Sequence, residues 1–126
     1  MSTLTELGFR PEIDGDGDIR FMYEGGNYYI TDNCDETFVY IMYPGFWSLE
    51  DRSEQLAGLM AANSTNSQVK AAKILLSKDM TRASVTIECL IREAGDVSSF
   101  LMRALRCIQL ARRTFRDEIQ GLTANN

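Results

Sequence analysis

The chain has 126 residues, of which 44% are hydrophobic and 25% are charged, and its formal net charge is −5. This size and this balance of residues are typical of one globular domain with one core, and they argue against a disordered polypeptide. The negative charge disfavours nucleic acid and anionic membranes as partners, because both repel an acidic protein.

The numbers of cysteines and histidines limit the catalytic chemistry that the protein can perform and indicate the cellular compartment in which it folds. The chain has three cysteines and no histidine. A Cys–His catalytic pair is therefore excluded, and an odd cysteine count is not typical of a disulfide scaffold. We interpret Cys34, Cys89 and Cys107 as free thiols in a reducing compartment, with Cys89 and Cys107 in the core. The N-terminus lacks the features of a signal peptide, and no stretch approaches the roughly 18 apolar residues that span a membrane. The sequence therefore predicts a cytoplasmic protein with no membrane partner.

A short helix is predicted at the start of the sequence. Thr3 and Glu6 form a capping-box pattern, and Gly8 can end the helix in a left-handed conformation. Residues 9–13 are predicted to form a strand. Pro11 has no backbone donor, so this strand should lie at the edge of a sheet.

Three more strands are predicted to continue an antiparallel meander. They cover residues 19–23, 28–31 and 38–43, and a tight glycine turn at 24–27 joins the first two. Pro44-Gly45 should end the last strand. Each strand is expected to pair with its neighbour in the sequence.

A middle helix is predicted from Ser48 to about Asn63. Ser48 is interpreted as the N-cap, with Asp51 completing a box-like pattern, and the polar run 63–68 should end the helix. Its predicted apolar stripe consists of Leu49, Leu56, Leu59 and Met60.

Two strands and a long helix complete the predicted order of elements. The strands cover about 71–77 and 82–91, and the second alternates apolar and polar residues, which indicates one buried face. The helix runs from 97 to about 120 with a 3.6-residue apolar period. We expect residues 1–120 to form a single α+β domain built on an antiparallel sheet, and residues 121–126 to be a frayed tail.

One acidic run suggests a metal site. The run Asp14-Gly-Asp-Gly-Asp18 supplies carboxylates at positions 1, 3 and 5 of an EF-hand loop. However, Ile19 stands where position 6 requires glycine, and Gly25 stands where position 12 requires glutamate. We interpret the run as a solvated turn. The glycines match no phosphate-binding motif either, so the sequence predicts no metal, no cofactor and no catalytic residue.

The last predicted helix is rich in arginine on the side away from its apolar stripe. This pattern would allow contact with nucleic acid, but it is also the ordinary polar face of an amphipathic helix. We favour the second interpretation. The arginines are Arg103, Arg106, Arg112, Arg113 and Arg116.

The strand at 38–43 is apolar on both faces, because all six of its residues are apolar or aromatic. Helices should cover one face of the meander. The other face is either covered within the domain, by the long helix or by loops, or it forms a homodimer interface or a peptide groove. We favour an interface or groove. The predicted contact residues are Tyr29, Tyr43, Phe46 and Trp47.

Three segments carry a resemblance to a known family. They are Leu7-Gly8-Phe9, Asp18-Ile19-Arg20-Phe21 and the run from Glu24 to Ile30 with the sequence EGGNYYI. With the order of elements, they resemble the YbjN-type domain, which belongs to the type III secretion chaperone-like fold. The resemblance implies an α+β fold that often dimerises. Secretion chaperones of this fold wrap an extended segment of a client around apolar patches, and YbjN-type proteins are described as regulators. The resemblance implies no catalytic residue.

The sequence therefore predicts a non-enzymatic protein-binding, chaperone-like or regulatory module that forms a homodimer and binds a polypeptide client. Two alternatives stay open. One is a regulator that contacts nucleic acid through the arginines of the last helix. The other is a small-molecule sensor with a pocket between the sheet and that helix.

Overall fold

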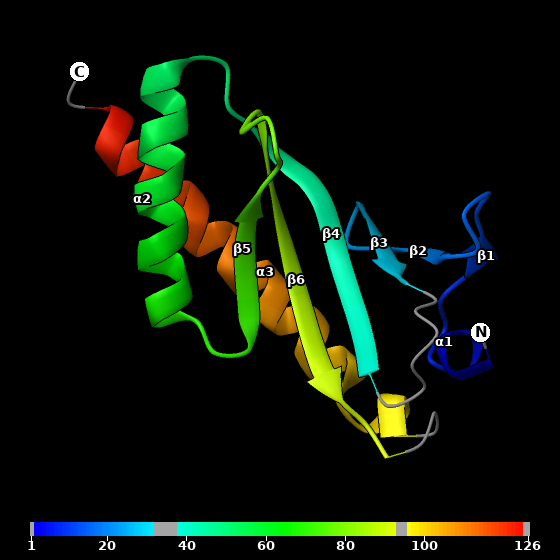
Figure 1. Ribbon diagram of the computed structural model, residues 1–126. Helices are drawn as coiled ribbons and strands as arrows, with labels where there is room; N and C mark the ends of the chain where they lie inside the picture. The colour runs from blue at the N-terminus through cyan, green and yellow to red at the C-terminus, as the bar shows by residue number, and fades with distance from the viewer. Residues whose placement is uncertain (1, 32–37, 93–95, 125–126) are drawn as a thin grey trace.

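The fold is described for residues 2–31, 38–92 and 96–124 of a computed structural model (Figure 1). Within these residues, one six-stranded sheet has the order β1-β2-β3-β4-β6-β5, and every neighbouring pair is antiparallel. The predicted α+β class and the predicted order of elements are confirmed. The elements are α1 (Ser2–Glu6), β1 (Glu12–Ile13), β2 (Ile19–Tyr23), β3 (Gly26–Ile30), β4 (Phe38–Ser48), α2 (Arg52–Gln68), β5 (Ala72–Leu76), β6 (Arg82–Leu90) and α3 (Val97–Thr123).

The first part of the protein forms the predicted meander. α1 ends before Gly8, which adopts a positive φ of 93° and donates its N–H to the Thr5 carbonyl at 3.0 Å. Strand β1 lies at the edge of the sheet, as the proline before it predicted, but it is shorter than expected. α1 begins at Ser2, so Thr3 is inside the helix and is not its N-cap.

Strand β4 is longer than predicted. Pro44 and Gly45 do not end it, because the strand extends to Ser48 through an irregularity between Tyr43 and Trp47. At this bulge Gly45 has a positive φ of 61° and donates its N–H to Ser84 Oγ at 2.9 Å. Proline is tolerated at a bulge because the ladder is already interrupted there.

Strand β6 lies between β4 and β5, so the later strand of the final hairpin takes the central position. Val85, Thr86 and Ile87 are all buried in succession. Continuous burial of this kind is expected for a central strand, because it has a partner strand on each edge and neighbouring side chains cover both of its faces. The predicted alternation is confirmed for Ala83, Val85 and Ile87, which face the core.

Helix α2 begins later than predicted. Ser48 is the last residue of β4, and the N-cap is Asp51, whose Oδ1 accepts the N–H of Glu54 at 2.8 Å. The carboxylate of Glu54 in turn accepts the N–H of Glu50 at 2.6 Å. Asp51 and Glu54 therefore form a box-like pair three residues further along the sequence than predicted, in which Glu54 binds the N–H of the residue before the N-cap.

Helix α2 also ends later than predicted, at Gln68, so the polar run does not break it. Tertiary contacts explain this difference. Thr65 is fully buried, and Asn66 pairs with the backbone of β5, accepting from the Ile74 N–H at 2.7 Å and donating to the Ile74 carbonyl at 3.3 Å. These polar side chains make contacts with other elements of the fold. Helix propensity depends only on the local sequence, so it does not predict such contacts.

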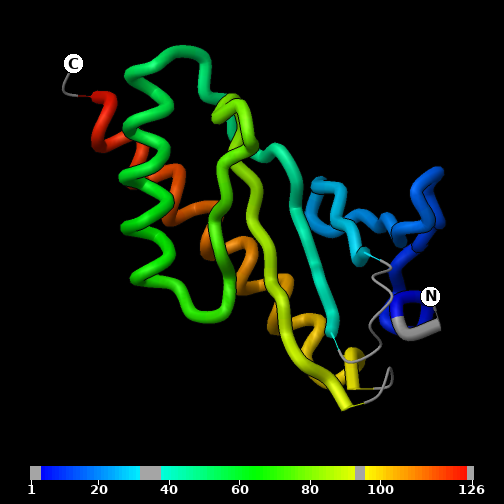
Figure 2. The backbone as a smooth tube through the Cα atoms, in the orientation of Figure 1, coloured from blue at the N-terminus to red at the C-terminus, as the bar shows by residue number. Residues whose placement is uncertain are grey.

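Helix α3 extends to Thr123, so residues 121–123 belong to the helix and not to a tail. Its predicted apolar stripe is confirmed as the buried face. In Figures 1 and 2, α3 crosses one face of the strands β4, β6 and β5, and α2 packs beside β5 and against α3. No helix of the described residues covers the opposite face of the sheet. None of these helices combines the length and the apolar character needed to cross a membrane.

Candidate functional site

The uncovered face of the sheet, here called the open face, carries both polar and apolar side chains. One row runs directly across it through paired positions of all six strands: Glu12, Arg20, Tyr29, Met42, Thr86 and Lys73. Large apolar residues lie beside this row and are exposed: Met22 (59%), Phe38 (44%), Leu75 (39%) and Leu90 (73%). Apolar groups of this size on an uncovered sheet face are typical of an interaction surface.

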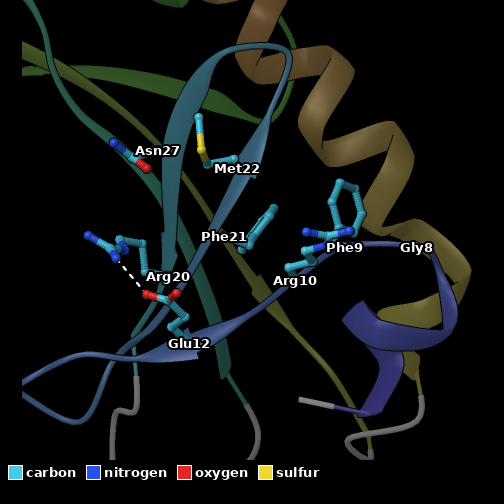
Figure 3. Close-up of a pocket in the computed structure, with 8 residues that line it drawn as sticks. All are labelled: Gly8, Phe9, Arg10, Glu12, Arg20, Phe21, Met22 and Asn27. Carbon is cyan, nitrogen blue, oxygen red and sulfur yellow. Dashed lines mark hydrogen bonds and ion pairs between the residues drawn. The ribbon is translucent and has the colours of Figure 1, made fainter.

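An ion pair anchors one end of this row. The Arg20 guanidinium donates to the Glu12 carboxylate at 2.6 Å, and this hydrogen bond and the negative charge raise the pKa of Arg20. The pair borders a cavity of about 600 Å³ between the N-terminal segment and β2 (Figure 3). The cavity is lined by Gly8, Phe9, Arg10, Glu12, Arg20, Phe21, Met22 and Asn27.

Helix α2 presents an apolar stripe outward. Leu56, Leu59 and Met60 are exposed by 52%, 46% and 60%. The predicted stripe therefore does not face the core, apart from Leu49, which precedes the helix and is buried. The buried face of α2 is made of the small residues Gly58, Ala61, Ala62 and Thr65 instead.

The four predicted contact residues do not all lie on the same face of the sheet. Tyr29 lies in the row on the open face. Tyr43, Phe46 and Trp47 belong to an aromatic cluster that reaches Phe115 of α3. In this cluster the Phe46 and Phe115 ring centroids are 5.4 Å apart, and the Trp47 and Phe115 centroids are 6.3 Å apart. The four residues therefore do not form one flat patch, and their role in an interface stays a prediction.

A cavity between β3 and β4 nevertheless brings three of the four together. In the described part of the chain, the ladder between the two strands pairs Tyr29 with Met42 and Ile30 with Ile41, and the Thr31 N–H donates to the Tyr40 carbonyl at 3.1 Å just beyond it. Towards the β2–β3 turn, a cavity of about 360 Å³, here called the β3–β4 cavity, lies between the two strands. It is lined by Gly25, Gly26, Asn27, Tyr29, Tyr43, Pro44, Gly45 and Phe46.

Arg112 of α3 packs against the aromatic wall of this region. Its guanidinium carbon lies 4.5 Å from the Tyr43 ring centroid and 6.0 Å from that of Phe46, and its Nη1 donates to Gln109 Oε1 at 2.8 Å. Such contacts are cation–π interactions. Arg112 was predicted to lie on the solvated face of the helix with the other arginines, and this prediction is wrong. Arg112 lies four residues after Ile108 and three before Phe115, so helical spacing could have placed it at the margin of the buried stripe.

A third cavity, of about 310 Å³, lies between β6 and α3. Cys89 and Cys107 both line it, and both are half-buried free thiols, not fully buried core residues as predicted. Burial raises the pKa of the Cys89 thiol. Cys34 lies outside the described residues. The other lining residues are Ala71, Ile87, Glu88, Leu90, Phe100, Arg103 and Ala104.

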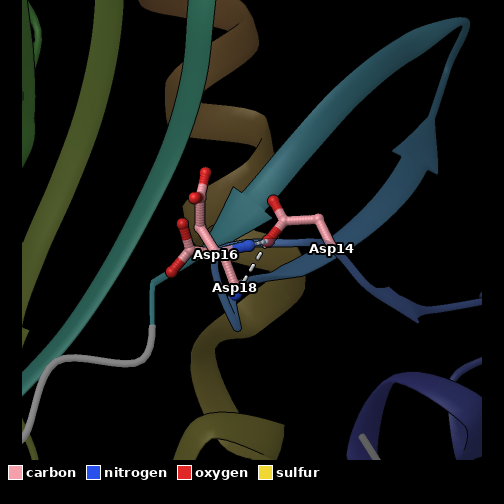
Figure 4. Close-up of side chains that lie close together, drawn as sticks. All are labelled: Asp14, Asp16 and Asp18. Atoms are coloured by element: carbon pink, nitrogen blue, oxygen red, sulfur yellow. Dashed lines mark hydrogen bonds between the residues drawn. The ribbon is translucent and has the colours of Figure 1, made fainter.

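The acidic run before β2 folds into a compact turn (Figure 4). Asp14 Oδ1 accepts the N–H groups of Asp16 at 2.9 Å and Asp18 at 3.0 Å, and the Asp14 carbonyl accepts the N–H of Gly17 at 3.1 Å. Carboxylate oxygens of the three aspartates lie within 4.8 Å of one another. Because one of these oxygens already accepts two backbone hydrogen bonds, the geometry is that of an Asx turn.

Comparison with known proteins defines the class of fold. No protein-family model matches the sequence, and no curated protein matches it significantly. Among solved structures, the chain is similar to YbjN from E. coli, which has been proposed to be a transcription regulator. The TM-score is 0.63 at 13% identity, over 87% of this chain and 83% of YbjN.

Two further structures extend this comparison. An uncharacterized protein from Methanothermobacter thermautotrophicus has a TM-score of 0.63 at 13% identity, over 95% of this chain and 93% of that one. The type III secretion chaperone SycH of Yersinia pestis, solved in complex with a stable fragment of YscM2, has a TM-score of 0.50 at 16% identity, over 86% of this chain and 93% of SycH. The chain therefore has a YbjN-like, type III secretion chaperone-like fold, as the sequence resemblance predicted.

Proposed function

We propose that this protein is a non-enzymatic module that forms a homodimer and binds a polypeptide partner in the cytoplasm. The observation that carries the proposal is the outward stripe of Leu56, Leu59 and Met60 on α2. Complete burial of one such side chain stabilises by about 1.5–3 kcal/mol. A stripe on one helix can pack against its own copy across a twofold axis, because the same patch then serves both subunits.

The open face of the sheet is the proposed surface for a polypeptide client. Met22, Phe38 and Leu90 expose apolar area there, and Tyr29 adds an aromatic group. The similar fold of SycH, a chaperone in complex with a polypeptide fragment, supports this part of the proposal. Tyr43 and Phe46, which line the β3–β4 cavity, and Trp47 beside it are kept as proposed contact residues.

The first test is the solution mass of the purified protein, measured by light scattering over a concentration series. We expect a mass of twice 14.2 kDa. The double variant Leu56→Glu/Met60→Glu should be a folded monomer, because two buried charges would oppose association. Leu110→Glu on α3, which changes a residue that is 47% exposed, is the matched control and should stay dimeric. A wild-type monomer at every concentration would refute the homodimer, and a dimeric double variant would exclude α2 as the interface.

A small-molecule sensor is the second candidate function. The cavity of about 310 Å³ between β6 and α3 supports it, because its position agrees with the pocket predicted between the sheet and the last helix. A thermal-shift screen that raises Tm in the wild type but not in a variant with the cavity filled, Ala104→Leu, would support this candidate.

A further inference from the structure

The cavity between β6 and α3, here called the β6–α3 cavity, has one wall that belongs to a single face of α3. This wall consists of Phe100, Arg103, Ala104 and Cys107. Their spacing of three and four residues places them side by side along the helix. The volume of about 310 Å³ is within the range of small-molecule sites in proteins. One helix face and the end of a strand therefore border a space that is large enough for a small ligand.

Most of the lining of the β6–α3 cavity is apolar. Ile87 and Ala104 are buried core residues, and Phe100 packs against the core from a half-buried position. The thiols of Cys89 and Cys107 add small, weakly polar surface. Burial raises the pKa of the Cys89 thiol, so this group is neutral at neutral pH. Such a lining favours the apolar part of a ligand, because the removal of apolar surface from water is favourable.

Two charged residues also line the cavity, and only one of them lacks an ion-pair partner among the described residues. The Glu88 carboxylate lies 3.1 Å from Lys73 Nζ. Strand alternation places Glu88 on the open face together with Thr86, on the side of the sheet away from α3. The Arg103 side chain is exposed and makes no salt bridge within the described residues. The unpaired charge at the cavity is therefore positive, and it lies beside an apolar wall.

We propose that the β6–α3 cavity binds a small carboxylic acid with an apolar body, and that the carboxylate pairs with Arg103 while the body contacts Phe100 and Ala104. This proposal rests on the second candidate function, the small-molecule sensor, and names the class of its ligand. The charge of Arg103 favours an anion over a cation, and its guanidinium can bind both oxygens of a carboxylate. The apolar lining favours an acid with a hydrocarbon body over a free inorganic anion.

The test is an NMR titration of the 15N-labelled protein with three eight-carbon probes, each below the concentration at which it forms micelles. Octanoate carries the carboxylate, 1-octanol has the same chain without a charge, and octylammonium has the opposite charge. We expect octanoate to shift the backbone amide signals of Cys89, Ala104 and Cys107 until they saturate. Octanol should bind more weakly than octanoate, and octylammonium more weakly still. Because a carboxylate is better hydrated than an alcohol, tighter binding of the acid requires an ion pair in the site.

Matched variants assign the charge and the cavity separately. Arg103→Gln should lower the affinity for octanoate about fivefold, which is the contribution of one partly exposed ion pair, and should leave the affinity for octanol unchanged. Arg106→Gln changes an exposed arginine of the same helix that does not line the cavity, so both affinities should stay as in the wild type. Ala104→Leu fills the cavity and should abolish the binding of both probes. Cys107→Met adds volume at a half-buried position and provides the same test if Ala104→Leu does not fold.

Thiol protection gives a second readout of where the acid binds. In a Cys34→Ser background, the cysteines that react with N-ethylmaleimide are Cys89 and Cys107, which both line the cavity. We expect saturating octanoate to slow the alkylation of both thiols, measured by mass spectrometry. Alkylation rates that do not change with octanoate would place the acid elsewhere and overturn the proposal.

The outcomes also separate this proposal from the candidate function on which it rests. If octanol binds as tightly as octanoate, or if Arg103→Gln binds octanoate as well as the wild type does, the carboxylate site is wrong, although the cavity can still hold a neutral ligand. If none of the probes shifts the three amide signals, the proposal is overturned. The small-molecule sensor then falls only if the thermal-shift screen also finds no ligand. The probes do not depend on the α2 stripe, so these results are independent of the homodimer.

Discussion

Glycine is required at position 26 for a reason that the sequence pattern does not indicate. In the sequence, Gly25 and Gly26 both appear to serve the tight turn between β2 and β3. Only Gly25 has a positive φ, of 81°. Gly26 is required for space, because a Cβ atom there would lie 2.2 Å from Cε2 of Tyr43. The ring of Tyr43 therefore packs directly on the backbone of β3, at the edge of the β3–β4 cavity.

This close contact predicts the effect of Gly26→Ala. The added methyl group must displace the Tyr43 ring, and overpacking of this kind costs about 1–3 kcal/mol. We expect a free energy of unfolding lower by that amount in a urea titration. Gly15→Ala is the control, because a Cβ at Gly15 meets nothing within 4 Å. Equal stability of the two variants would show that Tyr43 does not need the space over Gly26.

Asp79 is a second single residue with a specific structural role, because it stabilises the turn between β5 and β6. Its Oδ1 accepts from Ser77 Oγ at 2.7 Å, from Thr81 Oγ1 at 2.7 Å and from the Thr81 N–H at 3.1 Å. The hydrogen bonds from Thr81 and Ser77 lower the pKa of Asp79 from 3.8 to about 2. A lowered pKa in the folded state means that the carboxylate stabilises the fold above pH 3.8, and that this contribution is lost as the pH falls to about 2.

We therefore expect the stability difference between the wild type and Asp79→Asn to depend on pH. It should be largest near neutral pH and should shrink as the pH falls from about 4 to about 2, through the range of the two pKa values. Urea midpoints of both proteins over this range measure it. A difference that stays constant with pH would mean that the ionised form of Asp79 does not stabilise the turn.

At the scale of elements, α2 is the helix for which the sequence pattern predicts the wrong buried face. Apolar and small residues each recur with helical spacing along α2, so periodicity allows either stripe to face inward. The structure buries Gly58, Ala61 and Thr65, and α2 thereby packs closely on α3. Small side chains at a helix contact bring the two axes together, which larger side chains would prevent. Leu49, just before the helix, approaches the position of a Cβ on Gly58 to 3.0 Å and completes this packing.

The close packing of α2 predicts that it will not tolerate larger side chains on its buried face. Ala61 is 0% exposed, so Ala61→Leu should lower the free energy of unfolding by about 1–3 kcal/mol. Ser53→Leu makes the same side chain at an exposed position of the helix and should change stability by less than about 0.5 kcal/mol. Chemical unfolding of both variants measures this. A neutral Ala61→Leu would indicate that the α2–α3 contact is loose.

At the scale of the whole molecule, the sheet is covered on one face only. The described helices lie on the core side, where Phe21, Tyr28 and Ile41 are buried. On the open face, Met22 and Leu90 are exposed by 59% and 73%. The sequence of β4 is apolar on both faces of the strand, and the two faces have different roles in the structure. One face forms the core, and the other is available to a partner.

The sequence by itself determined the class of fold, the order of the elements and the alternation of β6, because hairpin turns, strand alternation and a long helical period are local patterns. Only the tertiary structure decided that β6 lies beside β4, that the leucine stripe of α2 faces outward, and that Arg112 turns into the aromatic cluster. Each of these depends on which surfaces meet, and the free energy of that contact comes from residues far apart in the sequence. A periodic stripe predicts that a helix has two faces, but the packing of its neighbours decides which of them is buried.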